Sequence, residues 1–266
     1  AEATSKGMVD SVLIGDAKKI EEIIKAEGLD LGNPEIIEAE DDIASAVTAV
    51  KLIAEGKGDV LLKGILQTAD LLRQVVNKEY GLLTGEIMSH CALFQIPDYH
   101  KLMILTDGGM VLNPDAVQKR YIVENAVRVM HNLGVAEPKV AALCATEVVN
   151  PKMQASVDAD ILKQQNQSGE IKGCYIEGPI SFDLTWSKES AAIKKFESPV
   201  TGDADILLFH DMVAGNVISK AINYIGHSTM AGIIVGAKVP IVIVSRGGTA
   251  EEKYLSLVCA AAASDE

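Results

Sequence analysis

The sequence predicts an α/β fold, and two observations lead to this prediction. Short runs rich in aliphatic and β-branched residues recur along the 266 residues, and segments with apolar residues at three- and four-residue spacing lie between most of them. This alternation is typical of mostly parallel strands covered by helices on both faces. The chain is 48% hydrophobic, which is enough for one large core or two modest ones.

Nine runs are expected as strands. They cover residues 12–16, 59–64, 92–96, 102–107, 139–146, 173–178, 206–211, 232–236 and 241–245. Helical spacing is clearest over residues 43–53 and 117–130. The segment "PDYHK", which joins 92–96 to 102–107, is too short for a crossover helix and predicts a hairpin, so the sheet should be mixed.

Charge and composition exclude several classes of protein. A formal net charge of −13 would repel nucleic acid and anionic membranes, so neither is an expected partner. No apolar run reaches the roughly 18 residues of a membrane span, and "AEATSKGMVD" lacks the layout of a signal peptide. These features predict a cytoplasmic protein. The cysteines and histidines show no metal-ligand spacing, so we expect reduced core cysteines and no metal site.

Ligands of open α/β sheets gather at the carboxyl ends of strands, where the segment "VSRGGTAEE" (244–252) follows the last predicted strand. Gly247 and Gly248 relax backbone sterics, and Thr249 with Glu252 fits a capping box that begins a helix. Backbone N–H groups would face an anion there, with Arg246 as a forked donor. The segment fits a phosphate site and a plain strand–turn–helix equally well.

Three further strand ends carry candidate residues. Lys63 and Gly64 end the predicted strand 59–64, and Thr68 is expected to cap the helix that carries Arg73. In "EGPISFD" (177–183), Gly178 and Pro179 are expected to break a strand, and Asp183 to enter a helix.

The last of these ends is "HDMVAGNVISK" (210–220). Asn216 is expected there as a helix cap, with Lys220 one turn into the helix. Asp107, before two glycines, marks either a crossing between lobes or a simple turn. Lys152 follows the helix-start pair "NP" and is either a cation of the site or a solvated first-turn lysine.

Several of these segments together resemble a known family. "SRGGTAEE", "EGPISFD", "GNVISK", "CATEVVNPKM" and "TGEIMSHCALFQIP", over essentially the whole chain, resemble the phosphate acetyltransferase and phosphate butyryltransferase family. "VLLKG", "EVVNPKM" and "IKGCYIEGPI" are more similar to the butyryltransferase branch. The resemblance implies a two-domain fold similar to isocitrate and isopropylmalate dehydrogenases, with ligands in an interdomain cleft. Residues 1–92 and 229–266 would form domain I, and residues 93–228 domain II.

The resemblance also implies the reversible reaction acyl-CoA + phosphate = acyl phosphate + CoA. It implies a homo-oligomer that uses CoA as a substrate and needs no cofactor. Ser245 and Arg246 match the family's Ser-Arg pair, and Glu252 stands where the family usually has a catalytic aspartate. Gly248 replaces a cysteine of the acetyl branch, and near Asn77 no arginine could be matched to that of the acetyl branch. Lys63 or Arg73 could supply the missing charge.

The chemistry of acyl transfer agrees with these assignments. A thiol near pKa 8.5 is mostly protonated at neutral pH, so a base such as Glu252 would raise the amount of attacking thiolate. Charge then builds on the carbonyl oxygen and the departing phosphate, where Ser245, Arg246 and the glycine N–H groups would donate hydrogen bonds. The residues expected to bind phosphate or substrate are Lys63, Arg73, Gly178, Asn216, Lys220, Gly247 and Gly248.

Three alternatives remain open at this point. Phosphate acetyltransferase is an alternative within the family, and a non-catalytic sensor of CoA or acyl phosphate is an alternative from another class. The third, a metal-dependent decarboxylating dehydrogenase, would share the fold but is disfavoured, because it would need both a spaced aspartate cluster for the metal and a GxGxxG segment after a strand, and the sequence has neither.

Overall fold

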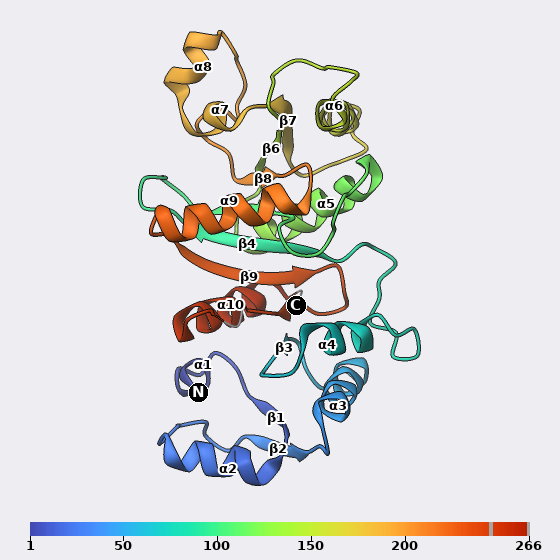
Figure 1. Cartoon of the computed structure of the whole chain (residues 1–266), viewed down its shortest axis with the longest axis vertical. Coiled ribbons are helices and arrows are strands. Elements are labelled where there is room, and N and C mark those ends of the chain that lie inside the picture. The colour runs from blue at the N-terminus through green and yellow to red at the C-terminus, as the bar shows by residue number, and fades with distance from the viewer. Residues whose placement is uncertain (245–246, 265–266) are drawn as a thin grey trace. The chain divides into compact units, whose positions relative to one another are not determined.

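The computed structural model describes residues 1–244 and 247–264, which separate into two compact units (Figure 1). Unit 1 combines Ala1–Glu86 with Gly236–Ser264, and unit 2 is Ile87–Val235. The expected domain boundaries, 92/93 and 228/229, differ from these by several residues. The first would cut through a strand, Ser89–Gln95, which pairs along its whole length with Thr229–Val235 and keeps both strands in unit 2.

Unit 1 alternates helices and short parallel strands, as predicted. Its elements are α1 (Glu2–Ser5), β1 (Val12–Gly15), α2 (Ala17–Ala26), β2 (Glu35–Glu38), α3 (Asp42–Ala54), β3 (Leu61–Leu62), α4 (Thr68–Val75), β10 (Ile241–Val242) and α10 (Ala250–Ala263). β1 pairs with β2, and β3 with β10, both in parallel. The sequence patterns did not predict β2, whose segment "EIIE" offers only two apolar residues between charged ones.

Helix starts in unit 1 follow from local side-chain chemistry. Asp16 caps α2 by accepting a hydrogen bond from the Lys19 N–H (3.0 Å), and Asp41 caps α3 through the Ala44 N–H (2.7 Å). α3 packs against α4, β1 and β3, while α10 packs against β10 and α1. Of the periodic residues predicted over 43–53, Val50 and Ile53 are buried in the inner face of α3, whereas Ile43 is 50% exposed.

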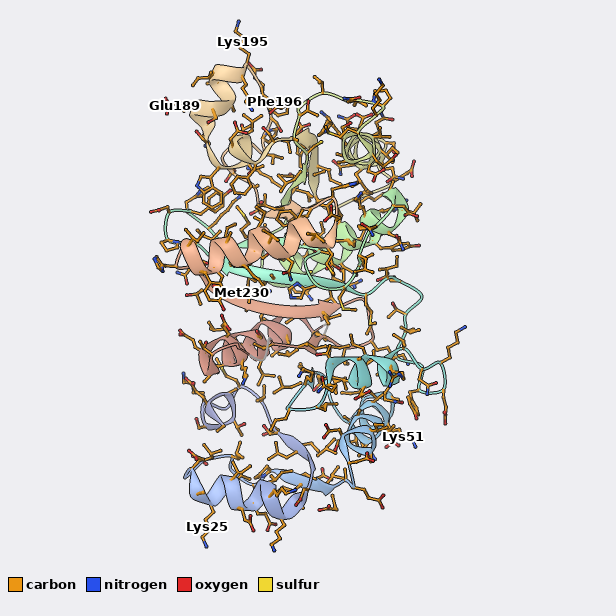
Figure 2. All side chains as sticks on the ribbon, viewed as in Figure 1. Lys25, Lys51, Glu189, Lys195, Phe196 and Met230 are labelled. Carbon is orange, nitrogen blue, oxygen red and sulfur yellow. The ribbon has the colours of Figure 1, made fainter. Side chains whose placement is uncertain are left out.

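Unit 2 also alternates strands and helices along most of its length. Its elements are β4 (Ser89–Gln95), β5 (Met103–Thr106), α5 (Ala116–Asn132), β6 (Lys139–Leu143), α6 (Gln154–Gln167), β7 (Tyr175–Ile180), α7 (Phe182–Trp186), α8 (Lys188–Lys194), β8 (Ile206–Leu208), α9 (Met212–Ile225) and β9 (Thr229–Val235). Lys195 ends α8 in the left-handed conformation (φ 54°), and its side chain points outward (Figure 2).

The sheet of unit 2 is mixed, as predicted from the hairpin. β4 pairs antiparallel with β5 and with β9, whereas β5, β8, β6 and β7 run parallel to one another in that order. The carboxyl ends of these four parallel strands therefore meet at one edge of the sheet, and their amino ends meet at the other. We refer to these as the carboxyl edge and the amino edge.

Helices cover both faces of this sheet. α9 packs against β5, and Figure 1 shows it in front of the strands, with α5 behind them. Phe94, Met103 and Leu105 belong to the core under α9, together with Ile218 and Ile222 of that helix. The buried residues of α5, predicted from their helical spacing, include Ile122, Val123, Ala126 and Met130.

β7 and the cysteines differ in how they compare with the sequence expectations. Gly178 and Pro179 do not break the strand, because β7 runs through both to Ile180. The cysteines are free, as predicted, with Cys91, Cys174 and Cys259 buried and Cys144 half-buried. Burial raises the pKa of Cys174 to about 12 and that of Cys259 to about 11, so both stay as thiols at neutral pH.

Candidate functional site

Lys63 lies where β3 and β10 end in unit 1. Its backbone N–H donates to the Val242 carbonyl (3.0 Å), which continues the parallel pairing of these strands by one residue. Its Nζ donates to the carbonyl oxygens of Gly64 and Leu66, both at 3.1 Å. The Lys63 ammonium is therefore held at the same edge from which the chain leaves β10 for the glycine-containing loop.

The loop after β10 ends in the predicted capping box. The Thr249 Oγ1 accepts a hydrogen bond from the Glu252 N–H, and the Glu252 Oε2 accepts one from the Thr249 N–H, each at 3.0 Å. Gly247 is exposed, and an added Cβ would have no neighbour within 4 Å, so space remains over its backbone. Gly248 is half-buried. Ser245 and Arg246, two of the three predicted catalytic residues, lie outside the described residues.

Arg73 is less closely tied to this edge. α4 begins with Gln67 at its N-cap, so the expectation that Thr68 caps it is wrong, and no side chain makes the capping bond. Arg73 lies in the last turn of α4, and its Nη1 contacts the Asp70 Oδ1 at 2.9 Å. Because the Arg73 side chain is 65% exposed, this ion pair adds little stability and leaves the guanidinium accessible.

In unit 2, Asn216 has a different role from the one predicted. Asp211, not Asn216, caps α9, through the Ala214 N–H (2.9 Å). Asn216 lies in the second turn, where its Nδ2 donates to the Gly108 carbonyl (2.9 Å). A Cβ on Gly215 would lie 2.5 Å from the Asp107 carbonyl oxygen, so glycine is required for this close approach of the helix to the turn.

Asp107 is a turn residue and does not mark a crossing between the units, since it lies well inside unit 2. It is 2% exposed, and its Oδ1 accepts hydrogen bonds from the N–H groups of Gly109 (2.7 Å) and Met110 (2.8 Å). Its Oδ2 accepts one from the His90 N–H (3.1 Å). The carboxylate thus organises the turn at the end of β5.

The other candidates of unit 2 lie apart. Gly178 is buried inside β7, where a Cβ would lie 2.7 Å from the Ala142 Cβ, so its structural role is close strand packing. Lys220 is exposed in the third turn of α9. Lys152 is exposed before α6, which begins at Gln154, so Lys152 does not occupy its first turn.

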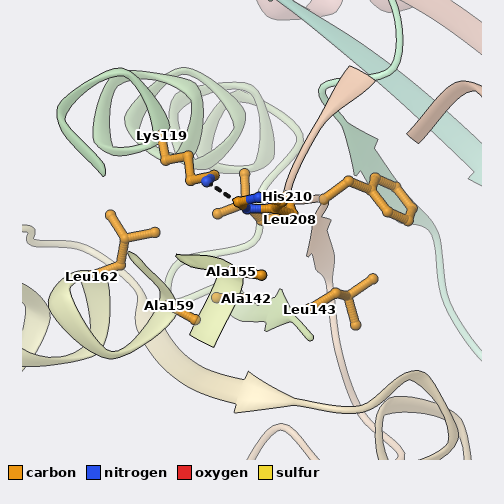
Figure 3. Close-up of a pocket in the computed structure, with 9 residues that line it drawn as sticks. Lys119, Ala142, Leu143, Ala155, Ala159, Leu162, Leu208 and His210 are labelled. Atoms are coloured by element: carbon orange, nitrogen blue, oxygen red, sulfur yellow. Dashed lines mark hydrogen bonds between the residues drawn. The ribbon is translucent and has the colours of Figure 1, made fainter. Parts of the chain in front are cut away.

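The candidate residues missed by the sequence analysis form a cluster at the carboxyl edge of unit 2. Lys119 of α5 contacts both Asp158 of α6 and His210 after β8, and Figure 3 shows the bond between Lys119 and His210. The Lys119 Nζ lies 2.5 Å from the Asp158 Oδ2 and 2.9 Å from the His210 Nδ1. The side chains of Lys119 and Asp158 are 3% and 4% exposed, so this is a buried ion pair.

These contacts select one tautomer of His210. An ammonium group can only donate, so the His210 Nδ1 must accept, and the ring proton of the neutral imidazole lies on Nε2. Partial burial and the nearby Lys119 charge lower the pKa of His210, which favours this neutral form at neutral pH.

Two hollows adjoin this cluster. The narrow one drawn in Figure 3 is mostly apolar and is lined by Ala142, Leu143, Ala155, Ala159, Leu162, Leu208 and Phe209 with Lys119 and His210. The wider one has a volume of about 280 Å³, and most of the residues that line it have polar side chains. It is lined by Asn113, Pro114, Asp115, Gln154, Asp158 and His210. His210 lines both hollows.

A second polar cluster lies where β6 and β7 end. Ser181 donates a short hydrogen bond to Glu147, and Lys194 contacts Glu147 (2.8 Å) and Asp183 (3.0 Å). The hydrogen bond from Lys194 lowers the pKa of Glu147, and that from Ser181 lowers the pKa of Asp183. As predicted, Asp183 enters a helix, α7.

One sequence signal could have revealed the Lys119 cluster. Lys119 precedes Ile122, Val123 and Ala126 by three, four and seven residues, so it belongs to the apolar stripe of the helix. A lysine at such a position requires a buried partner. The partners of Lys119 lie 39 and 91 residues away in the sequence, so no local sequence pattern identifies them.

The described residues contain neither a metal-ligand group nor a membrane-spanning helix. Within residues 1–244 and 247–264, no three His, Cys, Asp or Glu side chains are grouped as metal ligands would be. Within the same ranges, no helix has the length and apolar character needed to span a bilayer.

The fold is that of the α/β enzymes, a class in which ligands bind at the carboxyl ends of the strands. A profile of the family described as "Phosphate acetyl/butaryl transferase" matches residues 42–261, and the chain belongs to this family. It is a phosphate acyltransferase, an enzyme of the reaction acyl-CoA + phosphate = acyl phosphate + CoA.

Individual relatives agree with this assignment. A phosphate butyryltransferase from Clostridium acetobutylicum is 40% identical over 98% of this chain and 86% of its own length. A phosphate acetyltransferase from Thermotoga maritima is 38% identical over 95% of this chain and 85% of its own.

Solved structures support the same fold. The crystal structure of a branched-chain phosphotransacylase from Enterococcus faecalis is 33% identical and superposes with a TM-score of 0.82, covering 96% of this chain and 99% of the other. A protein from Salmonella typhimurium described as a 4-hydroxythreonine-4-phosphate dehydrogenase, 12% identical, superposes with a TM-score of 0.50 over 99% of this chain and 86% of its own. The predicted likeness to dehydrogenases of the isocitrate type is therefore confirmed at the level of fold.

Proposed function

We propose that this phosphate acyltransferase acts on butyryl or another short or branched-chain acyl group. The observation that carries the proposal is the similarity, over nearly the whole chain, to a phosphate butyryltransferase and to a branched-chain phosphotransacylase. Phosphate acetyltransferase is the alternative, because a relative with that activity is 38% identical. One methylene group of a substrate changes its binding free energy by only about 1 to 3 kcal/mol. The preferred acyl chain therefore follows from small differences in the pocket that holds it.

In the proposed mechanism the CoA thiolate attacks the acyl carbonyl carbon of the acyl phosphate. The new C–S bond forms, the C–O bond to phosphate breaks, and its electron pair leaves with the phosphate. Glu252 takes the thiol proton. Ser245, Arg246 and the N–H groups of Gly247 and Gly248 donate to the oxygens on which charge develops. The reverse reaction returns the proton as phosphate attacks the thioester.

The position of Glu252 is compatible with this role. The carboxylate is half-buried, and its Oε2 is held by the Thr249 N–H at 3.0 Å. A carboxylate that caps its own helix is thereby oriented, which reduces the entropy lost when it receives a proton from a substrate. The capping role and the base role therefore do not exclude each other.

Lys63 is the cation of the described residues with the best place to assist. It lies at the end of the strand that pairs with β10, and Arg246 follows β10 by four residues in the sequence. We propose that Lys63 adds charge for the phosphate. Arg73 and Lys220 are exposed and remain proposed contacts for the anionic parts of the substrates. The structural roles seen for Gly178 and Asn216 make them supports of the site in this proposal.

The decisive experiment measures phosphate-dependent release of CoA thiol from acetyl-, butyryl- and isobutyryl-CoA, with wild type, Glu252→Gln and Glu251→Gln. Glutamine keeps an acceptor for the Thr249 N–H and removes the base. Glu251 is the exposed neighbour in the same helical turn and provides the matched control. We expect butyryl or isobutyryl turnover to be highest, Glu252→Gln to lose most of it at an unchanged melting temperature, and Glu251→Gln to keep it.

Other outcomes decide against parts of the proposal. Preference for acetyl-CoA would identify a phosphate acetyltransferase. Binding of CoA with no release from any acyl-CoA would favour the non-catalytic sensor. Arg246→Ala should reduce turnover about a hundredfold, because losing one donor to a developing oxyanion costs about 3 kcal/mol.

A further inference from the structure

His210 presents a hydrogen-bond donor to the wide hollow of unit 2. Its Nδ1 is occupied by Lys119 (2.9 Å), which is itself anchored by Asp158 (2.5 Å), so the ring cannot reverse its tautomer without losing that bond. The remaining polar atom of the ring is the Nε2–H group. His210 is half-buried and lines the hollow, where this group can meet a ligand acceptor.

The opposite requirement, an acceptor for a ligand donor, is met by Gln154. Its Nε2 donates to the Asp158 Oδ1 (2.7 Å), which orients the side-chain amide and makes its Oε1 the acceptor that the side chain can offer. Gln154 and His210 come from different elements, the start of α6 and the end of β8, and both line the hollow. One fixed donor and one oriented acceptor suit a group that has both a C=O and an N–H.

The charge of the hollow restricts the ligand further. Lys119 and Asp158 neutralise each other as an ion pair, and Asp115 adds a carboxylate while it caps α5 through the Gln118 N–H (2.8 Å). The lining therefore carries a net negative charge, with His210 neutral. A phosphate or carboxylate group would be repelled, whereas a neutral polar group would not.

We propose that this hollow binds a neutral, amide-bearing segment of the CoA substrate, its pantetheine arm, with the His210 Nε2–H as donor to an amide carbonyl. A volume of about 280 Å³ lies near the lower limit of small-molecule pockets, about 300 Å³, and suits part of CoA rather than the whole molecule. The proposal rests on the acyl-CoA reaction under "Proposed function", because CoA is the substrate that contains such a segment.

The test is an NMR titration of the wild-type chain, observing the ring nitrogens of its histidines. The signals of His210 are assigned by their loss in His210→Phe. We expect the free protein to show His210 as the Nε2–H tautomer, and pantetheine to shift these signals. Adenosine 3′,5′-bisphosphate, which carries the anionic end of CoA without the amides, should leave them in place. If His210→Phe folds poorly, His210→Gln provides the same assignment, and the titration itself is read on wild type.

Binding measurements on variants sharpen the test. His210→Phe removes the donor and keeps a planar ring, so the Kd for pantetheine should rise about two- to tenfold, the usual effect of one neutral hydrogen bond. His227→Asn changes an exposed histidine at a positive φ, where asparagine is tolerated, and should leave the Kd unchanged.

Three results would overturn the proposal: an Nδ1–H tautomer, His210 signals that do not respond to pantetheine, or signals that respond to the bisphosphate instead. The thiol-release assay separates this inference from the proposed reaction. Turnover without a response at His210 refutes the pantetheine site alone, while a response without turnover refutes the proposed reaction alone.

Discussion

The two edges of the unit 2 sheet hold their polar residues in different ways. At the amino edge, Asp203 accepts hydrogen bonds from the His100 Nε2 (2.8 Å), the Lys101 Nζ (2.9 Å) and Lys139, and Lys101 also contacts Asp205 (2.9 Å). Five side chains from the starts of three strands are thus joined in one network. Each charge in it faces an opposite charge.

At the carboxyl edge, close packing, the buried Lys119–Asp158 ion pair and the Lys194 cluster join the strands and helices. Gly178 leaves room for Ala142, and Gly215 leaves room for the Asp107 turn. Lys119 and Asp158 form the pair, and His210 extends from it toward a hollow. In this comparison the charges of the amino-edge network face one another, whereas at the carboxyl edge His210 lines an open hollow.

Breaking the buried pair should have the largest effect on stability. Lys119→Met leaves the Asp158 carboxylate buried without its cation, and we expect the free energy of unfolding to fall by about 3 to 5 kcal/mol, measured by urea denaturation. The double variant Lys119→Met with Asp158→Leu should recover most of this loss, because no unpaired charge remains. Lys172→Met, at an exposed lysine, serves as control. A loss below about 1 kcal/mol in the single variant would mean that the pair is hydrated.

Overfilling the close packing should have an intermediate effect. A Cβ at Gly178 would lie 2.7 Å from the Ala142 Cβ and 3.1 Å from the Ala159 Cβ. Gly178→Ala should therefore lower the free energy of unfolding by about 1 to 3 kcal/mol. Adding Ala142→Gly removes the nearest clash and should restore part of the stability. If the second change gives no recovery in thermal melts, contact with Ala142 is not the cause of the loss.

The amino-edge network should give a smaller, pH-dependent effect. Partial burial alone would raise the pKa of Asp203, but hydrogen bonds from Lys139, Lys101 and His100 outweigh it and hold that pKa well below its ordinary value. A lowered pKa in the folded state contributes stability above the unfolded-state value, about 3.9, and this contribution is lost as pH falls below that value.

Melting temperatures of wild type and Asp203→Asn between pH 7 and pH 3 test this. Since Asp203 is 26% exposed, we expect the variant to cost about 1 kcal/mol at pH 7 and less at pH 3. The two curves should therefore converge in acid. If the two melting-temperature curves stay parallel down to pH 3, carboxylates other than Asp203 cause the loss of stability in acid.

Much of the fold could be predicted because its signals are local. The hairpin of β4 and β5 follows from a five-residue connection, and the start of α10 follows from the spacing of Thr249 and Glu252. Such signals fail where two patterns compete. Asn216 is a residue type that often caps helices, yet Asp211, five residues earlier, is the N-cap of α9. Asn216 donates a hydrogen bond to the Gly108 carbonyl instead.

The candidate site could be predicted only in part, for the same reason. The loop after β10 and Lys63 were found because a ligand-binding strand end has a recognisable composition. The cluster around His210 was not found, although Lys119 within an apolar stripe indicated that a partner must exist. Choosing Asp158 and His210 as partners requires the packing of α5 on α6 and the position of β8 between β5 and β6.

The sequence by itself determined the α/β class, the family, most strand positions and the capped helix after the glycine loop, because each depends on residues within a few positions of one another. Only the tertiary structure decided which distant side chains meet, which tautomer His210 adopts and where glycine is required by a neighbour. These properties depend on contacts between residues far apart in the chain, and hydrophobic spacing carries no information about the partner of a single buried charge.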